Sequence, residues 1–148
     1  MRDFRKILVP VDFSENAPQL LRDAADLAEK FGAGLAVVFV VQSFEDYSGF
    51  FVPHIPINQF EEELFRGATE KMAKFLAENL KPGVICESKI LQGDVAETLI
   101  EYAAANDISL IVMTTHGYKG LEKVLFGSVA ERVVKTAPCP VLTINPYK

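Results

Sequence analysis

The sequence has few cysteines and no excess of positive charge. Only two of its 148 residues are cysteine, and Cys86 and Cys139 are not in a metal-binding or redox spacing. We expect both to be small residues of the core, because a free cysteine packs as a hydrophobe. The net charge of −5 argues against a nucleic-acid-binding protein, whose affinity would depend on basic patches.

Long apolar runs are also missing. No run reaches the length of a membrane-spanning helix, and the first residues, MRDFRKILVPVD, lack the apolar region and cleavage site of a signal peptide. We therefore expect no membrane segment and a cytoplasmic protein. The hydrophobic fraction of 49% is enough for a sizeable core, and the length fits a single domain over residues 1–148.

The common glycine-rich phosphate motifs, GxGxxG and the P-loop, do not occur. A different glycine pattern lies between Leu110 and Lys135. There an apolar run ends at Met113, a loop follows, and Gly127-Ser128 opens a helical pattern. The free N–H groups and positive dipole of a helix start attract anions. Serine is also a good N-cap, so Ser128 is either a phosphate ligand or only a cap.

Short apolar runs alternate with helical patterns along the whole chain, which is typical of α/β proteins with a parallel sheet. The expected strands are Lys6–Val11, Leu35–Val41, Val84–Leu91, Ile108–Met113 and Val141–Ile144. The expected helices are Ala17–Phe31, Phe60–Leu80, one capped by Asp94 and one opened by Gly127-Ser128. We predict a doubly wound, five-stranded parallel sheet of order 3-2-1-4-5 with helices on both faces.

Two local features refine this prediction. Asp94 and Glu97 resemble a capping box, and the inner face of their helix is expected at Val95, Leu99, Ile100 and Ala103. The connection Gln42–Gln59 is unusually long. A lid over a ligand, a partner surface and packing over the helix ends are equally good interpretations of it.

The predicted strand order places a ligand site. In open α/β sheets, ligands bind outside the carboxyl ends of the strands where the strand order reverses. Here the reversal lies between strands one and four, whose ends are Pro10-Val11-Asp12 and Met113-Thr114. This argument does not use the glycine pattern, yet it points to the same place.

Several segments together resemble the universal stress protein family over nearly the whole chain: ILVPVDFSENA, LIVMTTHG, FGSVAERVV and APCPVLTI. Many members of that family bind ATP or a related adenine nucleotide through the motif Gly, two residues, Gly, nine residues, Gly, then Ser or Thr. In this sequence Gly117 is the second glycine and Gly127-Ser128 complete the motif. Thr114 occupies the position of the first glycine.

The resemblance implies a site for ATP, ADP or AMP, with Mg²⁺ as a further ligand. It implies adenine and ribose contacts from Pro10, Val11, Asp12, Val40 and Met113. It implies phosphate contacts from Gly117, Gly127, Ser128, Val129 and Ala130. Thr114, at the first motif position, belongs to the same nucleotide site. Lys119 and Lys123 are either cations near the phosphates or ordinary exposed lysines.

The resemblance also implies a homodimer, formed by pairing of the last strand, Val141–Ile144, which would otherwise be an exposed apolar edge. One hypothesis is thus a nucleotide-binding stress-response or signalling module with slow or no turnover and no catalytic residue. The alternative is a dimeric interaction protein that binds no nucleotide, because a Cβ at Thr114 would crowd a close ligand. A true ATP hydrolase is disfavoured, since no P-loop lysine is present.

Overall fold

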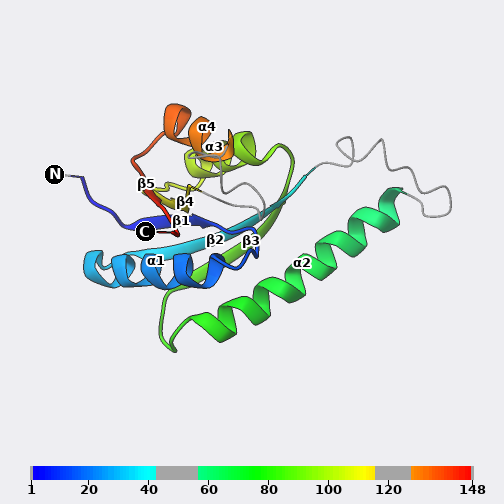
Figure 1. Ribbon diagram of the computed structural model, residues 1–148, viewed down its shortest axis with the longest axis horizontal. Coiled ribbons are helices and arrows are strands. Elements are labelled where there is room, and N and C mark those ends of the chain that lie inside the picture. The colour runs from blue at the N-terminus through cyan, green and yellow to red at the C-terminus, as the bar shows by residue number, and fades with distance from the viewer. Residues whose placement is uncertain (1, 43–56, 116–127, 148) are drawn as a thin grey trace.

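The computed structural model describes residues 2–42, 57–115 and 128–147. Within these ranges strands and helices alternate along the chain, as Figure 1 shows. The strands are β1 (Lys6–Pro10), β2 (Gly34–Val41), β3 (Cys86–Gln92), β4 (Leu110–Thr114) and β5 (Val141–Ile144). The helices are α1 (Ala17–Phe31), α2 (Ile57–Asn79), α3 (Val95–Ala105) and α4 (Ser128–Thr136). Each predicted element is present; α1 and β5 have the predicted bounds, and the ends of the others are shifted by a few residues.

The strands form one parallel sheet in the order β3-β2-β1-β4-β5. This confirms the predicted order. At the centre of the sheet Leu8 of β1 lies between Ala36 of β2 and Ile111 of β4. β3 and β5 form the two edges, as the predicted strand order requires.

Helices cover both faces of the sheet: α1 and α2 lie on one side, and α3 and α4 lie on the other (Figure 1). Successive strand residues point to opposite faces. Ile7 and Val9 therefore pack with α1 and α2, while Leu8 packs with α3 and α4. All three side chains are fully buried, so β1 is the central strand of two separate hydrophobic cores.

The prediction for the inner face of α3 was only half right. Its buried residues are Ala96, Leu99, Tyr102 and Ala103. Val95 packs at the margin of the core, and Ile100 is only partly buried. Apolar residues occur on nearly every side of this helix, so their spacing does not single out one stripe.

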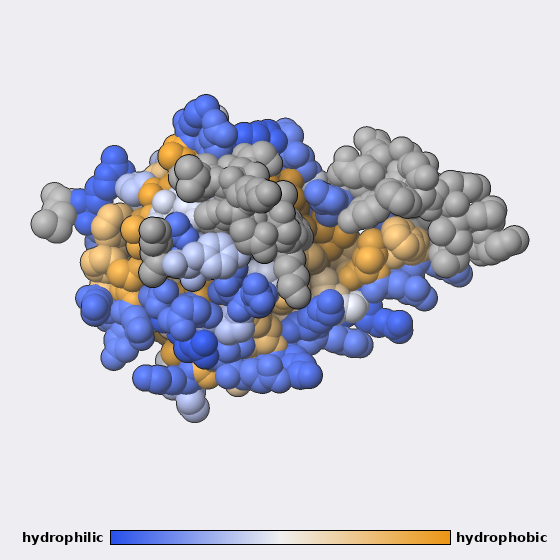
Figure 2. Space-filling model, viewed as in Figure 1, coloured by the Kyte–Doolittle hydropathy of each residue, from blue (hydrophilic) through white to orange (hydrophobic). Residues whose placement is uncertain are grey.

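The long helix α2 contacts the sheet with a narrow stripe. Ala68, Met72 and Phe75 are buried. In the space-filling view hydrophilic residues cover the outer side of α2, and apolar residues show along its inner side (Figure 2). The start of α2 at Ile57 also shortens the long connection expected between Gln42 and Gln59, of which residues 43–56 lie outside the described part of the chain.

The two cysteines are free and only partly buried, so the expectation of core positions was too strong. Burial is nevertheless the main cause that raises the pKa of both the Cys86 and the Cys139 thiol. A raised pKa keeps a thiol protonated and unreactive at neutral pH. This fits packing residues better than redox residues.

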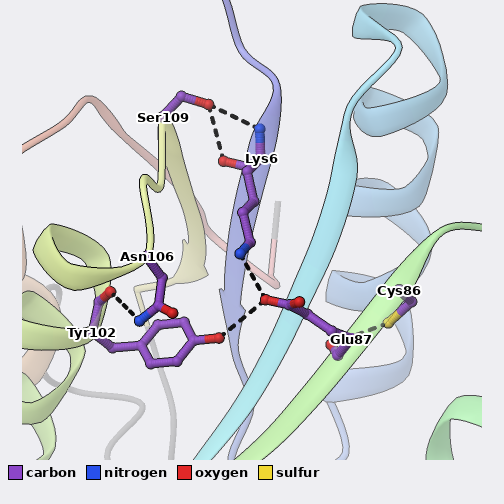
Figure 3. Close-up of polar contacts among 6 residues, drawn as sticks. All are labelled: Lys6, Cys86, Glu87, Tyr102, Asn106 and Ser109. Carbon is purple, nitrogen blue, oxygen red and sulfur yellow. Dashed lines mark hydrogen bonds and ion pairs between the residues drawn. The ribbon is translucent and has the colours of Figure 1, made fainter.

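Polar side chains fasten the amino ends of the strands. The Ser109 hydroxyl accepts a hydrogen bond from the Lys6 N–H and donates one to the Lys6 carbonyl, both at 3.0 Å. The Lys6 ammonium lies 2.8 Å from a Glu87 carboxylate oxygen, which also accepts a 3.3 Å hydrogen bond from the Tyr102 hydroxyl (Figure 3). These contacts tie β1, β3, β4 and α3 together at the amino edge of the sheet.

Candidate functional site

The carboxyl edge of the sheet divides between β1 and β4. The described ladder between these strands pairs only Ile7 with Leu110 and Leu8 with Ile111. Beyond Leu8, β1 continues along β2 to Pro10, and β4 continues along β5 to Thr114. The divided edge lies where the strand order reverses, which is the usual ligand position in sheets of this kind.

Pro10 is the last residue of β1, where it pairs with Val38 of β2. A proline cannot donate to a ladder, so it suits a strand end. The next N–H, from Val11, donates to the Val38 carbonyl at 2.9 Å and closes the ladder. The Val11 side chain lies in the core under α1 and α2, so its backbone is the part that can face a ligand on the other side.

Asp12 is fixed by a local turn. Its Oδ1 accepts a 2.9 Å hydrogen bond from the Ser14 N–H. The following residue, Phe13, has a φ of 58°, in the left-handed region that few non-glycine residues adopt. The Phe13 ring lies 4.8 Å from Phe39 and 5.7 Å from Phe75, centroid to centroid. These ring contacts hold the turn, so Asp12 sits on a braced backbone directly after β1.

Three of the predicted site residues come together on the side of the sheet that α3 and α4 cover. Val40 lies near the carboxyl end of β2, and Met113 lies near the carboxyl end of β4. Ala130 lies in the first turn of α4. All three belong to one hydrophobic cluster, each with less than a tenth of its surface exposed, and Val129 packs against that cluster. Their placement gives the carboxyl edge an apolar floor beside the start of α4.

A helix begins at Ser128, at the position that the sequence predicts as a candidate anion site. It runs for nine residues, and its first N–H groups lack partners within the helix. Thr114 is half-buried at the end of β4, and the next residue, Thr115, donates its N–H to the Ile144 carbonyl at 3.0 Å. The other glycines of the motif, Gly117 and Gly127, lie outside the described part of the chain, as do the candidate cations Lys119 and Lys123.

Sequence reasoning missed an ion pair at the same edge. Arg132 Nη1 of α4 donates to Asp94 Oδ2 at 2.9 Å. The same carboxylate oxygen caps α3 by accepting a 3.0 Å hydrogen bond from the Glu97 N–H, which confirms the predicted cap. The Glu97 N–H is the main cause that lowers the pKa of Asp94, followed by the Arg132 contact. The only signal for Arg132 in the sequence is its position four residues after Ser128, on the same helix face.

A groove lies at the other end of the molecule. It has a volume of about 810 Å³ and lies between the C-terminal ends of α1 and α2, with both acidic and basic residues around it, among them Arg22, Glu29, Glu78 and Lys81. It contains none of the predicted site residues. The strand topology and the apolar floor therefore favour the carboxyl edge over this groove, in spite of its size.

The described residues offer no preformed metal site. Among them no group of three or more His, Cys, Asp or Glu side chains could hold a metal ion. None of the described helices is both long and apolar enough to cross a membrane. Any Mg²⁺ at this edge would depend on oxygen ligands brought by a bound phosphate.

Comparison with known proteins gives a consistent result. Residues 3–145 match the model of the universal stress protein family. The chain is 35% identical to universal stress protein MJ0531 of Methanocaldococcus jannaschii over 98% of this chain and 84% of that protein. It is 34% identical to a universal stress protein of Thermus aquaticus over 96% of this chain and 99% of that one.

Solved structures agree in fold. The universal stress protein UspA from Lactobacillus plantarum superposes with a TM-score of 0.75 at 27% identity, over 98% of this chain and all of that one. The universal stress protein from Archaeoglobus fulgidus in complex with dAMP superposes with a TM-score of 0.59 at 25% identity, over 97% of this chain and 99% of that one. The second of these was solved with an adenine nucleotide bound.

Proposed function

The chain belongs to the universal stress protein family, and we propose that it binds an adenine nucleotide at the carboxyl edge of its sheet, with little or no turnover. The observation that carries this proposal is the division of the sheet between β1 and β4. The ladder ends at Leu8 and Ile111, and the two strand ends beyond it carry all the residues predicted for adenine and ribose except Val40, which lies on β2. A relative of the same fold in complex with dAMP supports the same class of ligand.

The proposed site has an apolar end and a phosphate end. Val40 and Met113 offer buried apolar surface for the adenine ring, and Asp12 offers a fixed carboxylate that can accept hydrogen bonds from ribose hydroxyls. The first turn of α4, Ser128–Ala130, would hold the phosphates through backbone N–H groups. Gly117 and Gly127 of the motif would contact the phosphates together with this turn. ATP, ADP and AMP all fit this division, with Mg²⁺ held by the phosphates.

We assign no catalytic residue. Efficient phosphoryl transfer needs a positioned water and stabilisation of charge on the transferred phosphate. By analogy with the family, Asp12 would lie at the adenine or ribose end of the site and not beside the transferred phosphate. The bound nucleotide would then act as a signal, and the protein would be a stress-response or signalling module. We propose that it is a single-domain cytoplasmic protein without nucleic-acid or membrane partners.

The proposed assembly is a homodimer through β5. Leu142 on this edge strand is 40% exposed, and an apolar edge strand tends to pair with another chain. A second copy of the chain could add its own β5 through a symmetric contact. Occupancy of the nucleotide site, at the end of the neighbouring strand β4, could then be coupled to the stability of the dimer.

One observation favours a second candidate function. Thr114 occupies the position of the first motif glycine, and a Cβ there would narrow the approach of a ribose or phosphate. If the Thr114 side chain blocks the nucleotide site, the chain would be a dimeric interaction protein of the same family that binds no nucleotide.

The two candidates are separated by the contents of the purified protein. We expect denaturation to release an adenine nucleotide, which mass spectrometry of the soluble fraction would identify. Replacing Ser128 by Asp would place a carboxylate at the proposed phosphate end while keeping a residue type that caps a helix start, and we expect this variant to release much less nucleotide. Equal amounts from both proteins would show that the nucleotide is held somewhere else.

A further inference from the structure

Arg132 lies one helical turn behind the proposed phosphate-binding end of α4. The helix begins at Ser128, so Arg132 follows its first residue by four positions, about 6 Å along the axis. Residues with this spacing share one face of a helix. Long side chains lean toward the N-terminus of their helix, which favours a guanidinium on the side of the start of α4.

The guanidinium is also anchored to the carboxyl edge of the sheet. Its Nη1 donates to Asp94 Oδ2 at 2.9 Å, and Asp94 is the N-cap of α3. The residue before Asp94, Gly93, donates its N–H to the Val41 carbonyl at the end of β2, at 3.0 Å. Through these contacts Arg132 is linked to the end of β2 at Val41.

Stability alone gives little reason for this ion pair. The side chains of Arg132 and Asp94 are 55% and 51% exposed, and exposed pairs contribute about 0–1 kcal/mol. The same exposure leaves the guanidinium within reach of a ligand. A guanidinium has five N–H donors in a planar fork that matches phosphate oxygens, so the contact through Nη1 leaves donors for a second anion.

We propose that Arg132, positioned by Asp94, contacts the phosphates of the bound nucleotide and determines the preference of the site for nucleotides over the nucleoside. This inference rests on the proposed nucleotide site, to which it adds a residue that the glycine motif does not contain. The helix start would supply N–H donors, and Arg132 would supply the positive charge. Asp94 would act only as a positioning residue.

The test measures affinities for ATP, AMP and adenosine by titration calorimetry, with the wild type and Arg132→Gln. Since a hydrogen bond to a charged group contributes about 1.5–3 kcal/mol, we expect Arg132→Gln to weaken ATP binding by about tenfold or more. Adenosine has no phosphate, so its affinity should not change. Arg132→Lys keeps the positive charge but lacks the planar guanidinium. Its affinity for ATP should lie between those of the wild type and Arg132→Gln.

A matched control lies on the same helix. Lys135 pairs with Glu131 at 2.9 Å, and both side chains are well exposed. Lys135→Gln therefore removes the same charge from α4, but about 10 Å from Ser128 along the axis. We expect it to leave the affinities for ATP and adenosine unchanged. If Lys135→Gln weakens ATP binding as much as Arg132→Gln does, net charge explains the effect and the assignment of Arg132 is wrong.

Other outcomes would also overturn the assignment. Equal ATP affinity of the wild type and Arg132→Gln would show that Arg132 does not contact phosphate. Equal losses for ATP and adenosine would show that Arg132 only supports the fold. If the wild type binds neither ligand, the nucleotide site itself is wrong and the role of Arg132 is refuted with it. This last result differs from the first two because it appears before any variant is made.

Discussion

Gly93 is the residue whose backbone most directly determines the geometry of the carboxyl edge. Its φ is +142°, a conformation that L-residues with a side chain rarely adopt. A Cβ built at Gly93 would lie 2.6 Å from Thr98 Oγ1. The position thus needs glycine for both conformation and space, and it places Asp94 at the start of α3.

We expect Gly93→Ala to destabilise the protein by about 1–3 kcal/mol, because a strained φ alone has a cost of this size. Chemical denaturation would measure the free energy of unfolding. Gly67→Ala is the matched control, since Gly67 lies within α2 and a Cβ there meets nothing within 4 Å. That change should stabilise the protein by about 0.5–1 kcal/mol. Equal effects of the two changes would contradict the strain assigned to Gly93.

Among the elements, β1, β3 and α3 are joined by contacts far apart in the sequence. The Glu87 carboxylate of β3 receives the Lys6 ammonium from β1 and the Tyr102 hydroxyl from α3 (Figure 3). The hydrogen bond from Lys6 is the main cause that keeps the pKa of Glu87 below its usual value. Burial, followed by the charge of Glu87, raises the pKa of Tyr102 from 10.0 to about 12.

This raised pKa has a measurable consequence. The folded state holds the Tyr102 proton more tightly than the unfolded chain does, so its contribution to stability is complete below pH 10. That contribution is lost as the pH rises from about 10 toward 12. Spectrophotometric titration should show a late-ionising tyrosine that Tyr102→Phe removes. Glu87→Gln should bring the pKa of Tyr102 only part of the way back to its ordinary value, because burial is the larger cause of the shift. A titration curve that Tyr102→Phe leaves unchanged in shape would refute the placement of this side chain.

The elements themselves could be predicted because their signals are local. The strand order followed from the alternation of apolar runs with helical patterns, and the Asp94 cap followed from its spacing to Glu97. The contacts of Arg132 with Asp94 and of Lys6 with Glu87 could not be predicted, because they join polar residues 38 and 81 positions apart. Periodicity carries no information on such pairs. The carboxyl edge was predicted from topology, whereas the cation beside it became evident only in three dimensions.

At the scale of the whole molecule, two edges of the sheet differ in character. β3 carries charged residues such as Glu87 and Lys89, and charges on an edge strand discourage pairing with another chain. β5 is the short run Val141–Ile144 with Leu142 exposed. This asymmetry favours a dimer through β5 and not through β3.

We expect Leu142→Lys to shift the protein from dimer to monomer, since a charge on β5 opposes burial of this edge. Sedimentation velocity at several concentrations would measure the change. Ile85→Lys is the control, because Ile85 is also an exposed apolar residue, at 78%, but precedes the other edge strand. A wild type that is monomeric at all concentrations, or a dimer that survives Leu142→Lys, would show that β5 is not the interface.

The central claim is that the carboxyl edge binds an adenine nucleotide, and titration of the wild-type protein with ATP and Mg²⁺ tests it most directly. Calorimetry should be run at two temperatures, because burial of apolar surface makes the binding heat vary with temperature and it can vanish at one of them. We predict saturable binding of one nucleotide per chain despite the Cβ of Thr114. No heat at either temperature, from protein freed of any bound nucleotide, would contradict the claim and favour the interaction protein.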